Sequence, residues 1–91
     1  MATKHLIIAG RVQGVSYRVW MIRQADRLGV SGWVRNRRDG TLEALVDGDT
    51  ASVEELLRLC RRGPPFAEVT EIVEELAEPC SEPGFGRMPT V

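Results

Sequence analysis

The order of the apolar patterns along the chain restricts its fold more than any other feature of the sequence. Two stretches repeat apolar residues at helical spacing, and four shorter runs have the composition of β-strands. Between the helical stretches, residues 37–40 (RRDG) join two of these runs, and Asp-Gly favours the positive φ angles of a tight hairpin. The predicted strands are residues 4–10, 30–36, 41–46 and 67–76, and the predicted helices are residues 17–28 and 52–60.

This order predicts an α+β fold of the ferredoxin-like, split βαβ type, in which two helices pack on one face of a mixed, largely antiparallel sheet. A chain of 91 residues has room for one hydrophobic core, so we expect residues 1–91 to form a single domain. Residues 77–91 are a Pro- and Gly-rich C-terminal segment, with Phe85 as its expected buried anchor and room for a short last strand. A right-handed crossover makes the first two strands parallel, so they end at the same edge of the sheet.

The ends of the predicted elements carry residues that favour capping. Ser16 precedes the first helix as its expected N-cap, and Gly29 follows it as the expected left-handed terminator. Ser52 and Glu55 match a capping box at the start of the second helix. Within residues 67–76 the alternation of apolar and polar residues breaks once, which indicates a β-bulge.

Charge and hydropathy exclude several classes of partner. A net charge of −1 provides no basic footprint for nucleic acid or for an anionic membrane. The apolar runs are far shorter than a transmembrane span or the core of a signal peptide. Arg35, Arg37 and Arg38 form a local basic cluster that either steers anions or solvates the hairpin. We therefore expect a cytoplasmic monomer with no nucleic-acid or membrane partner.

The cysteines and the single histidine do not form a metal-binding pattern. Cys60 and Cys80 lack the spacing of metal or redox motifs. Cys60 falls on the apolar side of the second helix, as a reduced core residue would, which favours the cytoplasm. His5 lies in a strand, where it more often packs or faces solvent than acts in catalysis. We expect neither a metal nor a cofactor.

The loop between the first strand and the first helix has the composition of an anion site. Residues 10–18 (GRVQGVSYR) include Gly10 and Gly14, which allow backbone N–H groups to turn toward one point at the positive end of a helix. Arg18 adds a planar set of donors that matches two phosphate oxygens. Asn36 ends the second strand and so lies near this loop. Each residue also has a structural explanation, because glycines make turns and Asn commonly caps them.

Taken together, these motifs resemble those of acylphosphatases. The resemblance rests on GRVQGVSYR at residues 10–18, LGVSGWVRNRRDGTLEALVDG at residues 28–48 and RRGPP at residues 61–65, in the same order. It covers roughly four-fifths of the chain. The loop departs from the common pattern at Ser16, where many relatives carry Gly, and at Tyr17, where Phe is more frequent.

The resemblance implies a hydrolase that cleaves acyl phosphates to a carboxylate and inorganic phosphate, without a metal, a cofactor or a covalent intermediate. In the family, the arginine that closes the loop binds the phosphoryl group, and the asparagine that ends the second strand positions the attacking water. These positions correspond to Arg18 and Asn36. The backbone amides implied to bind phosphate are those of Gln13, Gly14, Val15, Ser16, Tyr17 and Arg18.

The chemistry of such a reaction agrees with this residue set. Phosphoryl transfer requires mainly positioning and neutralisation of charge. A carboxylate is a weakly basic leaving group, since carboxylic acids have a pKa of about 4, and it needs no general acid. Asn36 offers a donor and an acceptor without a charge that would repel phosphate.

Two other functions use the same pattern. One is a binding module that holds an anion without turnover, and a related one is a maturation-type partner domain in a system that handles carbamoyl phosphate. The presence of both Arg18 and Asn36 favours hydrolysis, because mere binding needs no residue that positions water. An RNA-recognition module is excluded, since the strands HLIIAG and TLEALV carry no paired aromatic residues.

Overall fold

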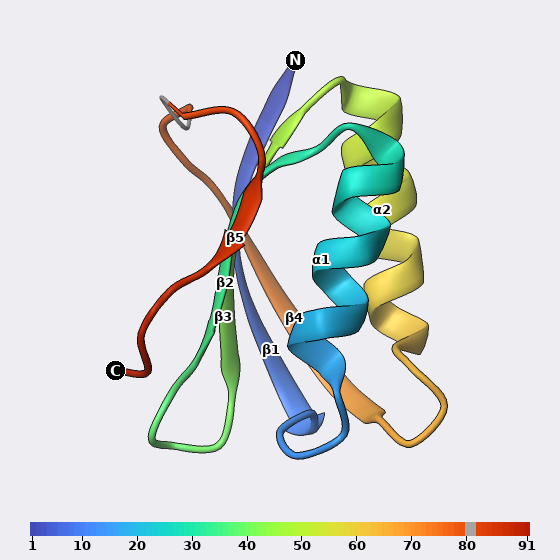
Figure 1. Ribbon diagram of the computed structural model, residues 1–91, viewed down its shortest axis with the longest axis vertical. Helices are drawn as coiled ribbons and strands as arrows, with labels where there is room; N and C mark the ends of the chain where they lie inside the picture. The colour runs from blue at the N-terminus through green and yellow to red at the C-terminus, as the bar shows by residue number, and fades with distance from the viewer. Residues whose placement is uncertain (80–81) are drawn as a thin grey trace.

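The computed structural model describes residues 1–79 and 82–91, so the expectation for Cys80 falls outside the described residues. Figure 1 shows two helices packed side by side on one face of a twisted sheet. In the described residues, neither helix is long and apolar enough to cross a membrane. The elements are β1 (Ala2–Arg11), α1 (Tyr17–Leu28), β2 (Ser31–Asn36), β3 (Leu42–Gly48), α2 (Thr50–Arg62), β4 (Glu68–Leu76) and β5 (Phe85–Arg87).

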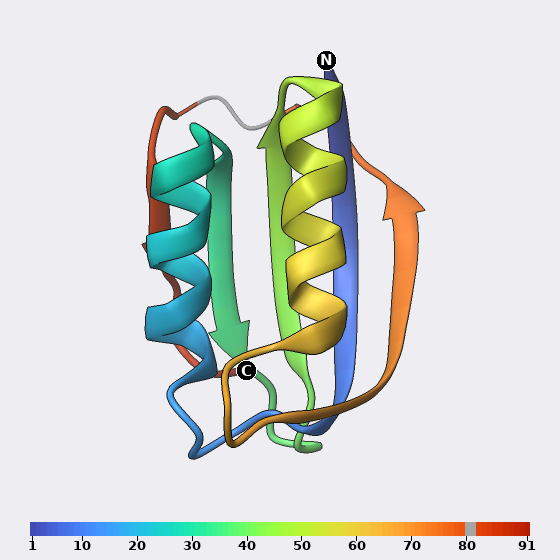
Figure 2. The ribbon, with the colours of Figure 1, turned by 90° about the vertical axis from the view of Figure 1, so that its right-hand side faces the viewer.

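The sheet has the strand order β4-β1-β3-β2-β5. All neighbouring strands are antiparallel except β2 and β5, which are parallel. Because β3 lies between β1 and β2 and runs against both, β1 and β2 point the same way. The predicted ferredoxin-like fold is therefore confirmed, including a short last strand. Figure 2 shows the consequence for function: the β1–α1 loop, the β2–β3 hairpin and the C-terminus gather at one end of the molecule.

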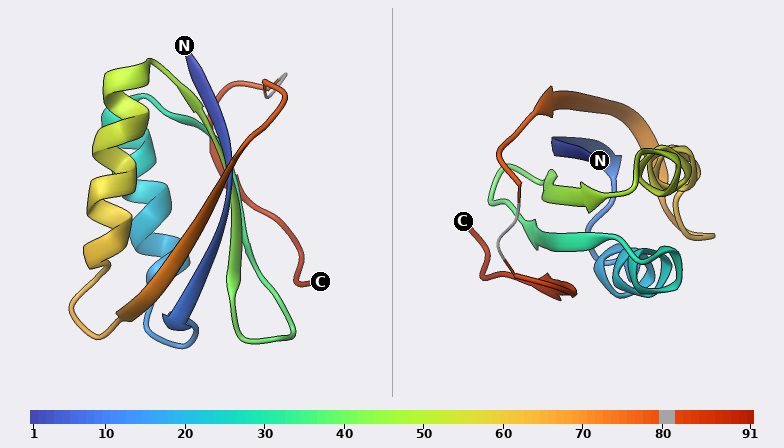
Figure 3. Two further views of the ribbon diagram at one scale, coloured as in Figure 1. Left: turned by 180° about the vertical axis from the view of Figure 1, so that it is seen from behind. Right: turned by 90° about the horizontal axis from the view of Figure 1, so that it is seen from above.

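The view from above in Figure 3 shows both helices on one side of the sheet, and the hydrophobic core lies between these two layers. Even-numbered residues of β1, β2 and β3 face the helices, which is the alternation expected of strands with one buried face. On α2, the predicted apolar face is buried as expected, and so is the anchor Phe85. The core consists of Leu6, Ile8, Val12, Tyr17, Met21, Ala25, Val30, Val34, Leu42, Ala44, Val46, Val53, Leu56, Leu57, Cys60 and Phe85.

The two ends of α1 follow the prediction in position but differ in mechanism. Gly29 ends the helix in the left-handed conformation, and its N–H donates to the carbonyls of Ala25 and Asp26. Ser16 is the N-cap residue, but its side chain makes no capping hydrogen bond, because its backbone is itself left-handed, with φ of 64°. The N-cap position was predicted correctly and the side-chain cap was not.

The predicted capping box at the start of α2 is wrong. The helix begins at Thr50 with Asp49 as its N-cap residue, so Ser52 and Glu55 lie inside the helix. The cause is the length of β3, which continues to Gly48 instead of ending two residues earlier. Pairing with β1 extends the strand, and that pairing depends on residues far away in the sequence.

The predicted bulge is present and explains the first glycine of the loop motif. The register between β1 and β4 shifts between Ala9 and Gly10, so Thr70 of β4 has no partner opposite it. Gly10 has φ of 121°, and a Cβ atom at this position would lie 2.1 Å from the carbonyl oxygen of Glu68. Gly10 therefore belongs to β1 and allows β4 to approach closely, whereas we had expected it to shape the anion loop.

Candidate active site

A pocket of about 360 Å³ opens at the end of the sheet where β1 and β2 terminate. The loop after β1, the first turn of α1, the end of β2 and the end of β5 all contribute to it. Both predicted catalytic residues and five of the six predicted loop residues line it. The lining residues are Val12, Gln13, Gly14, Ser16, Tyr17, Arg18, Val19, Asn36 and Arg87.

Two left-handed residues shape the loop. Gly14 has φ of 72°, and a Cβ atom there would meet no heavy atom within 4 Å. Glycine is therefore favoured here by the backbone conformation and not by a lack of space for a side chain. Ser16 also has a positive φ, and in the described residues no other non-glycine residue does. Left-handed residues in such a turn direct neighbouring N–H groups toward an anion. Val15, between them, does not line the pocket, and its half-buried side chain packs against the core.

The side chain of Gln13 ties this loop to the β2–β3 hairpin. Its Nε2 atom donates to the carbonyl oxygen of Arg37 at 2.7 Å and to that of Thr41 at 2.9 Å. These carbonyls lie at the two ends of the hairpin turn, just after Asn36 and just before β3. The tether holds the loop and Asn36 at a fixed separation. The resemblance implies a role only for the backbone amide of Gln13, because nothing in the local sequence indicates a partner for its side chain.

Asn36 is the last residue of β2 and carries an unsatisfied polar atom. Its Oδ1 atom is buried, and in the described part of the chain no group donates a hydrogen bond to it. Leaving a buried acceptor unpaired costs about 1–3 kcal/mol. Its backbone is held firmly, since its carbonyl accepts from the N–H of Val91 at 3.2 Å. Buried polar atoms are nearly always paired in folded proteins, so an unpaired one in a residue that lines a pocket points to a functional role.

Two arginines line the pocket and no carboxylate does. Arg18 comes from the first turn of α1 and Arg87 from β5. Neither guanidinium makes a hydrogen bond or an ion pair with any residue that the structure describes. Sequence reasoning found Arg18 and missed Arg87, because only the parallel pairing of β5 with β2 brings Arg87 to this place. The pocket is electropositive, since the described residues that line it include two arginines and no carboxylate.

Tyr17 is among the residues that line the pocket, but its side chain belongs to the core. The hydroxyl donates to the carbonyl oxygen of Cys60 at 2.6 Å, and the ring packs edge-to-face against Trp20, with centroids 5.2 Å apart. Burial raises the pKa of Tyr17 far above its usual value. Burial also raises the pKa of the Cys60 thiol to about 12, so this cysteine is an inert core residue, as predicted.

Of the remaining charged residues, His5 and Arg35 lie on the open face of the sheet, whereas Arg37 and Arg38 lie in the hairpin between β2 and β3. His5 and Arg35 both contact Glu43, with N–O distances of 2.6 and 2.7 Å, and the guanidinium of Arg35 lies 4.8 Å from the ring centroid of Trp33. Burial alone would raise the pKa of Glu43, but the hydrogen bonds from His5 and Arg35 outweigh it and hold the pKa below its usual value. Arg35 therefore supports the sheet and does not face the pocket.

Two hollows of about 470 Å³ are larger than this pocket. One lies where α1 approaches the loop after α2, and the other lies between Trp33 and residues 82–88. Neither includes Arg18, Asn36 or the left-handed loop. The residues that line the smaller pocket, and not its volume, identify it as the candidate site.

The chain has a split βαβ fold with an electropositive pocket. That pocket is formed by a left-handed loop, two arginines and an unpaired asparagine oxygen. These features define a class of small α+β proteins suited to binding a compact anion. The family model described as acylphosphatase matches residues 4–86. An acylphosphatase from Acidiphilium cryptum is 66% identical over 90 residues, which cover 99% of both chains.

Solved structures agree with this match. The acylphosphatase from Bacillus subtilis superimposes with a TM-score of 0.90 at 31% identity, over 97% of this chain and 99% of that one. HypF from T. kodakarensis contains a similar fold, with a TM-score of 0.81 at 26% identity, over 99% of this chain and 12% of that one. The chain belongs to the acylphosphatase family and is an enzyme of that family.

Proposed function

We propose that the protein hydrolyses acyl phosphates to a carboxylate and inorganic phosphate without a metal ion. In this proposal the backbone amides of residues 13–18 and the guanidinium of Arg18 bind the phosphoryl group, and Asn36 positions the attacking water. Family membership supports the reaction class. The arrangement of these residues around one pocket supports their roles.

The observation that carries the proposal is the buried, unpaired Oδ1 atom of Asn36. A carbonyl oxygen accepts a hydrogen bond from water and thereby orients the lone pair of that water. The Gln13 tether and the bond from Val91 restrict the backbone on either side of the site, so the water would be held at a defined distance from the loop. Holding a nucleophile in line contributes a large part of the rate in phosphoryl transfer.

The electrostatics of the pocket suit this reaction. Negative charge develops on the phosphoryl oxygens and on the leaving carboxylate, and guanidinium and N–H groups stabilise such charge in a partly desolvated site. No carboxylate lines the pocket to repel the substrate. The leaving carboxylate needs no proton, because its conjugate acid has a pKa of about 4. The chemistry therefore needs only groups that this pocket contains.

The experiment that tests the proposal is hydrolysis of benzoyl phosphate in the presence of EDTA. We expect rapid turnover by the wild type and a fall in kcat of about 100-fold or more in Asn36→Ala, as for the loss of one positioned group in other enzymes. Arg18→Ala should raise KM and lower kcat. Arg38→Ala, which removes an exposed arginine outside the pocket, is the control and should keep both constants within twofold.

Failure of the wild type to turn over benzoyl phosphate, in a sample that is folded by circular dichroism, would contradict the proposal. If the same sample bound inorganic phosphate, the protein would be an anion-binding module. The likeness to 12% of HypF favours a partner domain of a larger assembly as the second candidate.

We further propose that residues 1–91 act as one domain and as a cytoplasmic monomer. Size-exclusion chromatography with light scattering tests the oligomeric state, and cell fractionation tests the location.

A further inference from the structure

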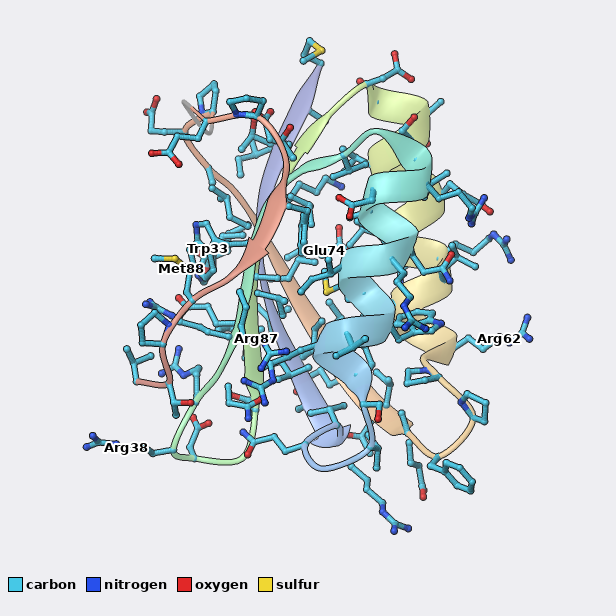
Figure 4. All side chains as sticks on the ribbon, viewed as in Figure 1. Trp33, Arg38, Arg62, Glu74, Arg87 and Met88 are labelled. Atoms are coloured by element: carbon cyan, nitrogen blue, oxygen red, sulfur yellow. The ribbon has the colours of Figure 1, made fainter. Side chains whose placement is uncertain are left out.

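Arg87 is a charged residue of the pocket to which the proposed mechanism assigns no role. It lies on β5, the edge strand next to β2, and lines the pocket with Arg18 and Asn36. Arg87 is exposed, as are Arg38 and Arg62, but Figure 4 shows its side chain beside the first turn of α1, whereas those of Arg38 and Arg62 point away from the molecule. The two pocket arginines thus come from separate elements, a helix and a strand.

The backbone around Arg87 is fixed by the parallel ladder with β2. The N–H of Gly32 donates to the carbonyl of Gly84 at 3.0 Å, and the N–H of Met88 donates to the carbonyl of Val34 at 3.0 Å. In this register Arg87 lies opposite Val34. Opposite residues of paired strands share a face, and residues two apart on one strand do as well. Arg87 therefore shares the helix-facing side of the sheet with Asn36.

The charges around Arg87 favour the binding of an anion. In the described residues Arg87 has no acidic partner, whereas Arg35, Arg58 and Arg61 each pair with a glutamate. The pocket brings it together with a second unpaired guanidinium, that of Arg18. Two like charges in one pocket repel each other. A ligand with a charge of about −2, such as a phosphoryl group near neutral pH, removes this repulsion.

We propose that Arg87 is a second phosphate-binding residue, and that Arg87 and Arg18 hold the substrate's phosphoryl group from the strand side and the helix side of the pocket. This inference rests on the proposed function, which supplies the substrate. Guanidinium groups bind phosphate oxygens through paired N–H donors, so two of them can engage the phosphoryl oxygens at the same time.

The position of Arg87 favours the phosphoryl group over the acyl group as its target. In an in-line displacement the attacking water and the leaving group lie on opposite sides of the phosphorus atom. Asn36, which would hold the water, and Arg87 lie on adjacent strands and share a face. A residue beside the water lies next to the phosphoryl oxygens and away from the leaving carboxylate.

The test compares Arg87→Gln with Arg62→Gln, which removes the same charge from a solvent-exposed arginine outside the pocket. Inorganic phosphate is the probe, with its Kd measured by isothermal titration calorimetry, together with KM for benzoyl phosphate. We expect Arg87→Gln to raise both constants by about tenfold, as for the loss of one charge-assisted contact in a partly exposed site. Arg87→Lys should recover part of the loss, and Arg62→Gln should change either constant by less than twofold.

Two results would overturn the inference in a variant whose circular dichroism matches the wild type. One is a phosphate Kd for Arg87→Gln within twofold of the Arg62→Gln control. The other is a higher KM with an unchanged phosphate Kd, which would place Arg87 at the acyl group. Because phosphate binding is measured without turnover, the two proposals can fail separately. A wild type that binds phosphate through Arg87 but does not hydrolyse benzoyl phosphate would contradict only the proposed hydrolysis.

Discussion

Replacement of Tyr17 by Phe tests whether the hydroxyl of this residue stabilises the core and has no role in the reaction. The hydroxyl donates to the carbonyl oxygen of Cys60 near the C-terminal end of α2. In a continuing helix this carbonyl would accept from the residue four positions on, but that residue is Pro64, which has no N–H. The N–H of Gly63 is used by Leu59. Tyr17 therefore supplies a donor that the helix itself lacks.

The size of the effect follows from this geometry. Tyr17 is 1% exposed, so water cannot easily replace the missing hydroxyl. A buried carbonyl left without its donor costs about 1–3 kcal/mol of unfolding free energy. For a domain of this length each kcal/mol lowers Tm by about 4–8 °C, so Tyr17→Phe should lower Tm by roughly 4–24 °C.

Thermal unfolding followed by circular dichroism measures this change, and hydrolysis of benzoyl phosphate provides the control. We expect kcat and KM to stay within twofold of the wild type. Since burial holds the pKa of Tyr17 above its usual range, the difference in Tm should be the same at pH 6 and pH 9. A fall in Tm of less than about 2 °C would refute the reasoning. A tenfold loss of kcat with unchanged stability would instead place the hydroxyl in the active site.

Two further substitutions test local features of the structure. Ser16→Gly should raise Tm by about 2–5 °C. Glycine removes the strain of the left-handed backbone, about 1–2 kcal/mol, and this gain exceeds the free energy lost to the greater conformational entropy of the unfolded chain. Ser16→Ala keeps the strain, so an equal rise in Tm in that variant would contradict this explanation. Glu43→Gln should lower Tm at pH 7, because His5 and Arg35 hold the pKa of Glu43 below its ordinary value of 4.5 and the ionised form stabilises the fold. This stabilisation is complete above the ordinary pKa and is lost as pH falls through the folded-state pKa. The Tm values of the wild type and of Glu43→Gln should therefore converge as pH falls below 4.5. A difference in Tm that does not depend on pH would argue for a packing effect.

The parts of the fold that depend on near neighbours were predictable. The helix at residues 17–28 has the predicted bounds, and its terminator Gly29 behaves as expected. Such features follow from spacings of a few residues and from the conformational freedom of glycine. The proximity of Arg18 and Asn36 was also predictable, because the split βαβ topology makes β1 and β2 end at the same edge.

The features that the sequence did not reveal all involve contacts between distant segments. Gly10 is required by β4, the Gln13 side chain binds a hairpin more than twenty residues away, and β3 is extended by its pairing with β1. Arg87 reaches the pocket only because a three-residue strand pairs in parallel with β2. The local composition there, rich in Gly and Pro, allows a short last strand but does not indicate its partner or its register.

The sequence by itself determined the order of the elements, the apolar faces of the helices and the edge of the sheet at which a site could form, since these depend on periodicity and on the handedness of the crossover. The tertiary structure alone decided which polar atoms meet there. Strand register and loop tethers are set by packing over the whole sheet, and a shift of one residue would turn Asn36 and Arg87 to the opposite face. The unpaired oxygen of Asn36 and the two unpaired arginines are therefore consequences of the assembled fold.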